Sequence, residues 1–137
     1  MSSRTRAREQ ALQVLYLIDL SSIAPKEALQ FFQMNFENHE DDLPFVEKLV
    51  CGVTEKRESL DSLIEETSEN WKISRMPRID RNILRLGAFQ LIHCKDIPPA
   101  VAMDESIELA KRFGEDRTPA FVNGLLDRIF KEHVRSV

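Results

Sequence analysis

The sequence predicts an all-α protein of about seven helices that form two small packed helical bundles. No segment sustains the alternation of apolar and polar residues that is typical of a half-buried strand. The chain has only four glycines, and its apolar residues recur at helical spacing instead. Connectors are short and no low-complexity tract interrupts them, which favours one compact helical domain over residues 1–137.

Four helices are predicted in the first half of the chain. The first spans residues 4–20 and places one apolar stripe along its length, made of Ala7, Ala11, Val14, Leu15 and Ile18. The second spans residues 25–36 and begins at a proline, which suits a first helical turn because no backbone N–H is needed there. Residues 38–42 are predicted to be a loop. The third helix begins at Pro44, and the fourth lies around residues 60–67.

The helix predicted at residues 77–93 follows a short connector that contains Trp71 and ends at a proline. It is apolar around most of its circumference, so we expect it to be central in the packing. Gly87 within it, and Gly124 later in the chain, interrupt helical segments at a cost of roughly 1 kcal/mol relative to alanine. We therefore expect a neighbouring helix to approach closely at both glycines.

The last two helices have explicit start and stop signals. Pro98 and Pro99 predict the start of one helix, and Gly114 is placed to end it in a left-handed conformation. Thr118 and Pro119 are predicted as the N-cap and first turn of the final helix. Its apolar stripe is Val122, Leu125, Leu126, Ile129 and Phe130.

Composition excludes several classes of protein. Apolar residues make up 42% of the chain and charged residues 31%, which is typical of a soluble globular protein. No apolar run approaches the roughly 18–20 residues that cross a bilayer, and the N-terminal segment lacks the apolar stretch of a secretory signal. These features predict a cytoplasmic protein without a membrane partner. Cys51 and Cys94 are then expected to be buried thiols rather than a disulfide.

The chemistry-bearing residues argue against an enzyme. His39, His93 and His133 lie far apart in the sequence, and no histidine or cysteine pair has the spacing of zinc ligands. Phosphate-binding loops and dinucleotide fingerprints are missing. Asp104 and Glu105 are adjacent, but neighbouring residues on a helix diverge and would not share a substrate. The sequence suggests no catalytic residue, no metal and no small-molecule cofactor.

Charge is distributed unevenly along the chain despite a net charge of only −4. Acids dominate residues 37–69, whereas bases dominate residues 72–85. Arg4, Arg6 and Arg8 precede the first acid, and guanidinium groups suit phosphates because they form fork-shaped, charge-assisted hydrogen bonds. Such a cluster indicates nucleic-acid binding, although a solvated N-terminal tail has the same pattern.

Three segments carry a resemblance to a known family. They are RAREQALQVLYLIDL at residues 6–20, IDRNILRLGAFQL at residues 79–91, and IPPAVAMDESIELAKRFG followed by FVNGLLDRI near the C-terminus. In this order the chain closely resembles the NusB transcription antitermination family. The resemblance implies an all-helical fold of two bundles and binding to a boxA-type RNA element in nascent ribosomal RNA operon transcripts. It also implies partnership with the ribosomal protein NusE, and with RNA polymerase and other Nus factors through the assembled complex.

Matching the chain to the family position by position implies an RNA-binding set. The arginines would contact phosphates, and aromatic side chains can stack on unpaired bases. We expect the start of the last helix to form an anion site next to the arginines. Core roles are the alternative for the two aromatic members. The full set is Arg4, Arg6, Arg8, Tyr16, Arg117, Thr118, Phe121 and Asn123.

The resemblance also implies a surface for the ribosomal protein on the apolar helix at residues 77–93. Asp80 matches an acidic family position there, although a carboxylate in a first turn also stabilises its own helix. Arg81, Asn82 and Arg85 would extend that surface. The alternative function is a protein-interaction adaptor that binds no RNA. Monomeric and homodimeric free states are both compatible with the sequence.

Overall fold

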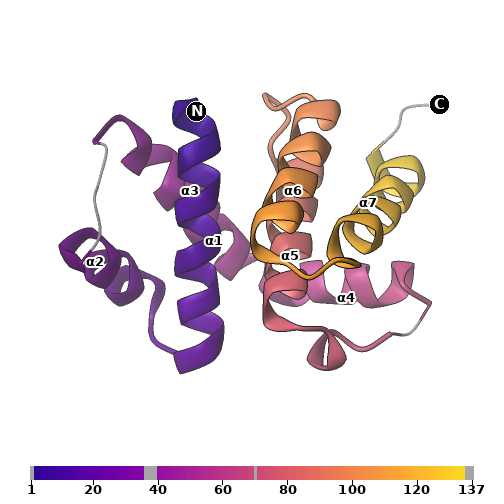
Figure 1. Cartoon of the computed structure of the whole chain (residues 1–137), viewed down its shortest axis with the longest axis horizontal. Coiled ribbons are helices and arrows are strands. Elements are labelled where there is room, and N and C mark those ends of the chain that lie inside the picture. The colour runs from indigo at the N-terminus through magenta and orange to yellow at the C-terminus, as the bar shows by residue number, and fades with distance from the viewer. Residues whose placement is uncertain (1, 36–39, 70, 135–137) are drawn as a thin grey trace. The chain divides into compact units, whose positions relative to one another are not determined.

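A computed structural model of the chain describes residues 2–35, 40–69 and 71–134. Within these ranges the chain forms seven α-helices and no strand (Figure 1), so the all-α prediction is confirmed. The chain divides into two compact units, Met1–Glu55 and Lys56–Val137. Two of the residues considered above, Phe36 and His39, lie outside the described residues.

The first unit contains the helices α1 (Ser3–Ser21), α2 (Pro25–Asn35) and α3 (Leu43–Glu55). The first of these packs against both of the others. Two alanines one turn apart, Ala7 and Ala11, are completely buried on α1, as the predicted apolar stripe requires. Residues 40–42 differ from the predicted loop, because they form a 3₁₀ turn, η1 (Glu40–Asp42), whose last residue is buried.

The second unit contains four α-helices and two short helical segments. In chain order these are α4 (Arg57–Thr67), the 3₁₀ turn η2 (Ile73–Arg75), α5 (Arg78–His93), α6 (Pro99–Phe113), α7 (Thr118–Ile129) and the π-helical segment η3 (Phe130–Val134). The start of α6 at the two prolines agrees with prediction, because Pro98 is its N-cap and Pro99 its first residue.

The helix α5 is the centre of this unit, as its apolar sequence predicts. It packs against α4, α6, α7 and η3, and every residue from 82 to 91 is buried. Two buried side-chain amides in that run are satisfied within the helix: Asn82 donates to the carbonyl oxygen of Arg78 at 2.8 Å, and Gln90 donates to that of Leu86 at 3.0 Å. A helix surrounded in this way fixes the positions of the elements at its two ends, and the candidate site of this unit lies at its N-terminal end.

The two mid-helix glycines have different reasons to be glycine. A Cβ on Gly87 would lie 2.7 Å from Leu126 Cδ1 and 2.7 Å from Ser106 Oγ, so α5 tolerates no side chain where α6 and α7 approach it. The close approach predicted there is confirmed. The same prediction is wrong for Gly124, because nothing lies within 4 Å of a Cβ built at that position.

Gly114 ends α6, but not in the predicted left-handed conformation. Its φ is −92° and its ψ is −173°, which is extended backbone open to any residue. Glycine is needed for another reason, since a Cβ would lie 2.6 Å from the side chain of Thr118. The prediction of two buried thiols is also half wrong: Cys94 is buried, whereas Cys51 is exposed, and both are free.

Candidate functional site

Three predicted RNA-binding arginines, Arg4, Arg6 and Arg8, occupy the first two turns of α1, and we call them the arginine head. The helix begins immediately before them because the Ser2 hydroxyl accepts a hydrogen bond from the Thr5 N–H at 3.1 Å. An N-cap of this kind satisfies a backbone donor that would otherwise lack a helical partner. The arginine head is therefore part of a capped helix rather than a solvated tail.

An aromatic ring of α3 holds two members of the arginine head. The guanidinium carbon of Arg4 lies 4.0 Å from the centroid of the Phe45 ring, and that of Arg8 lies 5.3 Å away. Cations at such distances are attracted to the negative face of the ring. Arg8 is only 3% exposed, whereas Arg4 is exposed. Of these two, Arg4 is the arginine whose side chain is accessible from solvent, and the phosphate contacts expected of both stay predictions.

A buried carboxylate anchors the remaining arginine. Arg6 Nε donates to Asp42 Oδ2 at 3.2 Å, and the Ser3 hydroxyl donates to Oδ1 of the same carboxylate at 2.5 Å. The side chain of Asp42 has no exposed surface, while that of Arg6 is 33% exposed. A charged hydrogen bond to a buried group orients a flexible arginine before any ligand arrives. Asp42 was not singled out by the sequence analysis, because it lies 36 residues from its partner.

In the second unit, the start of α7 is tied to the start of α5. Thr118 Oγ1 donates to Asp80 Oδ1 at 3.1 Å and accepts from the backbone N–H of Glu115 at 3.0 Å. The prediction that Thr118 is the N-cap is therefore wrong: it is the first helical residue, and Arg117 is the N-cap without a side-chain bond. Because Thr118 is buried, its hydroxyl bonds to Asp80 of α5 instead of capping its own helix.

The surroundings of Asp80 disfavour the charged form of its carboxyl group. Burial raises its pKa above the ordinary value of 3.8, and the negative charge of Glu115 raises it further, whereas the hydrogen bond from Thr118 opposes both effects. Loss of hydration disfavours the charged form of any carboxyl group. Asp80 and Thr118 were assigned to different partners by the sequence analysis, yet they form one hydrogen-bonded pair.

An open pocket lies beside this pair, and we call it the aromatic pocket. The rings of Trp71 and Phe121 meet there with their centroids 4.8 Å apart and their planes at 56°. The pocket has a volume of about 410 Å³. The residues lining it are Trp71, Arg75, Pro77, Asp80, Glu115, Arg117, Thr118 and Phe121. Three predicted RNA-binding residues, Arg117, Thr118 and Phe121, are therefore brought together with one predicted partner-binding residue.

Trp71 and Arg75 complete the aromatic pocket, and the sequence analysis missed both. Trp71 is 45% exposed, which is unusual for so large an apolar side chain. The signal available in the sequence was a lone tryptophan in a polar connector, directly before a run of basic residues. Its neighbour in the pocket, Phe121, lies 50 residues later in the chain, so the pairing follows only from the packing of α7 beside that connector.

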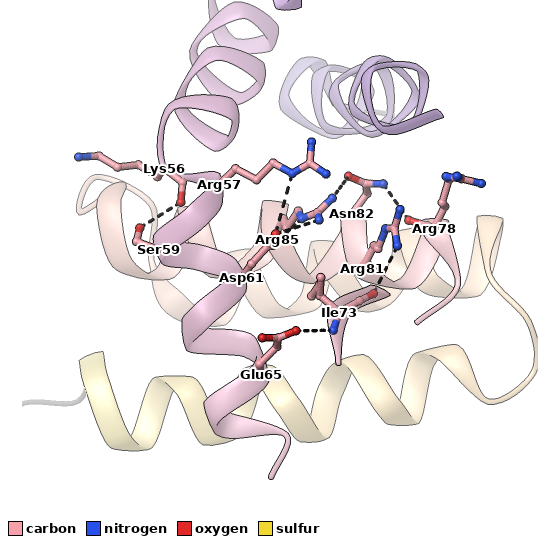
Figure 2. Close-up of polar contacts among 10 residues, drawn as sticks. All are labelled: Lys56, Arg57, Ser59, Asp61, Glu65, Ile73, Arg78, Arg81, Asn82 and Arg85. Carbon is pink, nitrogen blue, oxygen red and sulfur yellow. Dashed lines mark hydrogen bonds and ion pairs between the residues drawn. The ribbon is translucent and has the colours of Figure 1, made fainter. Parts of the chain in front are cut away.

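The four predicted partner-binding residues of α5 differ in their exposure. Figure 2 shows Arg85 directed at Asp61 of α4, with Nε to Oδ1 at 2.7 Å and a second bond to Oδ2 at 3.0 Å. Arg85 is 2% exposed and Asn82 is 1% exposed. The amide oxygen of Asn82 also accepts from Arg85 at 3.2 Å. Arg85 therefore joins α4 to α5, and Asn82 supports Arg85 from within α5. The role of both side chains in a partner surface stays a prediction.

The other members of the predicted sets are more accessible. Arg81 is partly exposed, and its Nη1 donates to the carbonyl oxygen of Ile73 at 3.4 Å (Figure 2). Asn123 of α7 is exposed, and Tyr16 of α1 is partly exposed. The arginine head and the start of α7 belong to different units, so the anion site predicted where they meet stays a prediction. None of the described helices is long and apolar enough to cross a membrane.

Comparison with known proteins defines the class to which this fold and site belong. A sequence profile of the NusB family matches residues 5–131. A transcription antitermination protein NusB from Desulforapulum autotrophicum is 47% identical over 131 residues, covering 94% of this chain and 92% of that protein. A protein of the same name from Bacillus pumilus is 48% identical over 126 residues, covering 92% of this chain and 93% of the other.

One similar chain comes from the solved structure of an assembly. The crystal structure of antitermination factors NusB and NusE in complex with dsRNA contains a chain that is 32% identical to this one, with a TM-score of 0.86. The match covers 97% of this chain and 99% of that chain. The protein described here belongs to the NusB family.

Proposed function

We propose that this protein is a transcription antitermination factor that binds boxA-type RNA in nascent ribosomal RNA operon transcripts. It acts together with the ribosomal protein NusE, in a complex with RNA polymerase and other Nus factors. The observation that carries the proposal is the match over nearly the whole chain to proteins named for antitermination. A structural relative crystallised with NusE and dsRNA supports both the RNA and the protein partner.

The chemistry of the described residues supports binding rather than catalysis. The arginine head offers guanidinium groups that are oriented by Asp42 and Phe45, and pre-oriented donors lose less entropy when a phosphate binds. The aromatic pocket offers ring surface and two further arginines. We therefore assign a non-enzymatic role, in the cytoplasm where transcripts are made, to one RNA-binding domain that comprises both units over residues 1–137.

The test is a titration of the purified full-length protein with a fluorescently labelled boxA-type RNA. A scrambled RNA of the same length is the specificity control, and each titration is repeated with the ribosomal protein present. We expect the boxA-type RNA to bind more tightly than the scrambled RNA, and the ribosomal protein to increase that difference. Binding of the ribosomal protein without any binding of RNA would instead identify a protein-interaction adaptor.

A further inference from the structure

The aromatic pocket contains a tryptophan side chain that is only partly covered by its neighbours. Trp71 contacts Phe121 on one side, yet nearly half of its surface remains accessible at 45% exposure. An aromatic side chain left open beside a pocket is therefore a candidate surface for a planar ligand.

The edge of the aromatic pocket is suited to an anionic ligand. Arg75 and Arg117 line it and are both exposed. Glu115 and Asp80 also line the pocket and oppose this charge, but Asp80 Oδ1 already accepts a hydrogen bond from the Thr118 hydroxyl. Ring surface next to two arginines matches a base that is followed by its phosphate.

We propose that the aromatic pocket binds one unpaired base of the RNA, stacked on Trp71 and flanked by Phe121, with Arg75 and Arg117 at the neighbouring phosphates. The proposal rests on the proposed function and assigns Trp71 and Arg75, which the family resemblance did not supply. A volume of about 410 Å³ lies near the lower end of the range of about 300–1,000 Å³ for ligand pockets. That size suits a single ring system better than a folded peptide segment.

Intrinsic fluorescence can test this directly, because Trp71 is the only tryptophan in the chain. The full-length protein is titrated with single-stranded boxA-type RNA while tryptophan emission is recorded. In parallel, the anisotropy of a labelled copy of the RNA reports total binding. We expect emission to be quenched with the same concentration dependence as the anisotropy change. In a series of RNAs with one abasic site each, one position is expected to abolish the quenching.

Substitutions separate stacking from charge. Trp71→Ala is expected to weaken RNA binding by about 5- to 150-fold, the range for loss of one aromatic–base stack, without changing the dependence of affinity on salt. Trp71→Phe is expected to retain most of the affinity. Arg75→Ala is expected to lower the salt slope by about one. The matched control is Arg78→Ala, an exposed arginine nearby that does not line the pocket, which is expected to leave the slope unchanged.

Each alternative result has a distinct meaning. RNA binding by anisotropy without quenching, and with equal affinity for Trp71→Phe and Trp71→Ala, would overturn the base site and leave the proposed function intact. Quenching by the ribosomal protein alone, with none by RNA, would assign the pocket to a protein partner. Absence of RNA binding under both conditions would overturn the site and the proposed function together. If Trp71→Ala does not fold, the wild-type quenching and the abasic series still decide.

Discussion

The arginine head and the aromatic pocket, which we propose as two RNA-binding sites, are built in different ways. In the arginine head, cationic side chains are held by partners inside their own unit: Phe45 lies under Arg4, and the buried Asp42 holds Arg6. In the aromatic pocket, apolar surface is left exposed and the arginines stand at its edge. The first arrangement depends on charge and therefore on salt, whereas the second adds aromatic stacking surface to the charge of its arginines.

The difference teaches that anchoring has a cost and a benefit. A buried carboxylate such as Asp42 loses its hydration, and its attraction to an arginine offsets that loss only with good geometry. The benefit is an arginine that is already oriented when RNA arrives. The aromatic pocket needs no such anchor, because a tryptophan ring has few rotatable bonds and keeps its shape. Five substitutions would break or sharpen this contrast.

The largest effect is expected from Gly87→Val, which overpacks the contact of α5 with α6 and α7 in the unit that contains the aromatic pocket. The new side chain would meet Leu126 and Ser106, and overpacking of this kind destabilises a core by about 1–3 kcal/mol, occasionally more. Urea denaturation measures the change. Gly124→Ala is the control, since its Cβ meets nothing within 4 Å, and it should stabilise by roughly 0.5–1 kcal/mol. Equal effects at the two glycines would contradict the packing described here.

The second largest effect is expected from Asp42→Asn, which removes the charged acceptor of Arg6 in the arginine head. Loss of the charged acceptor for Arg6 and Ser3 should lower the free energy of unfolding by about 1–3 kcal/mol. RNA affinity should also fall, because Arg6 is no longer oriented. The control, Asp41→Asn, removes the same charge from an exposed neighbour. Simple repulsion of RNA by acids predicts tighter binding for both variants, so tighter binding by Asp42→Asn would refute the anchoring role.

A smaller effect separates charge from stacking. Arg4→Ala should weaken RNA binding and lower the slope of log affinity against log salt by about one. It should also lower the free energy of unfolding by about 0.5–1 kcal/mol, because the exposed cation–π contact with Phe45 is lost. Phe121→Leu should weaken binding at every salt concentration with no change of slope. Lys26→Ala, an exposed cation on α2, serves as the control for loss of charge. The contrast between the two regions fails if Arg4→Ala and Phe121→Leu give the same slope.

The smallest effect is a pH dependence caused by Asp80. Its raised pKa means that the folded state binds a proton more tightly than the unfolded state. Stability should therefore increase as the pH falls from neutral through that raised pKa, and the penalty is fully present at neutral pH. Asp80→Asn keeps an oxygen for the Thr118 hydroxyl and should remove this increase. Thermal unfolding over this pH range measures the change in stability, and Asp104→Asn, at an exposed position, is the control. If Asp80→Asn kept the wild-type pH profile, Asp80 would be excluded as the source of the pH dependence.

The sequence by itself determined the helices, because apolar spacing and prolines act within one or two turns, whereas the caps predicted at Gly114 and Thr118 were wrong. It placed α6 correctly from two adjacent prolines, and it predicted that α5 would be central from its apolar circumference. It also supplied the resemblance to the NusB family and, with it, the arginine head and Phe121. All of these signals are local or depend on residue type.

Tertiary structure alone decided which distant side chains meet. Arg6 and Asp42 lie 36 residues apart, and Asp80 and Thr118 lie 38 apart. No local pattern specifies such pairs, because they form only when separate helices bury their apolar faces against each other. The same packing decided why Gly114 must be glycine, why Gly124 need not be, and that an unremarked tryptophan in a connector would complete the aromatic pocket. Short-range sequence patterns fix where helices start and stop, whereas burial between helices fixes the chemistry of the site.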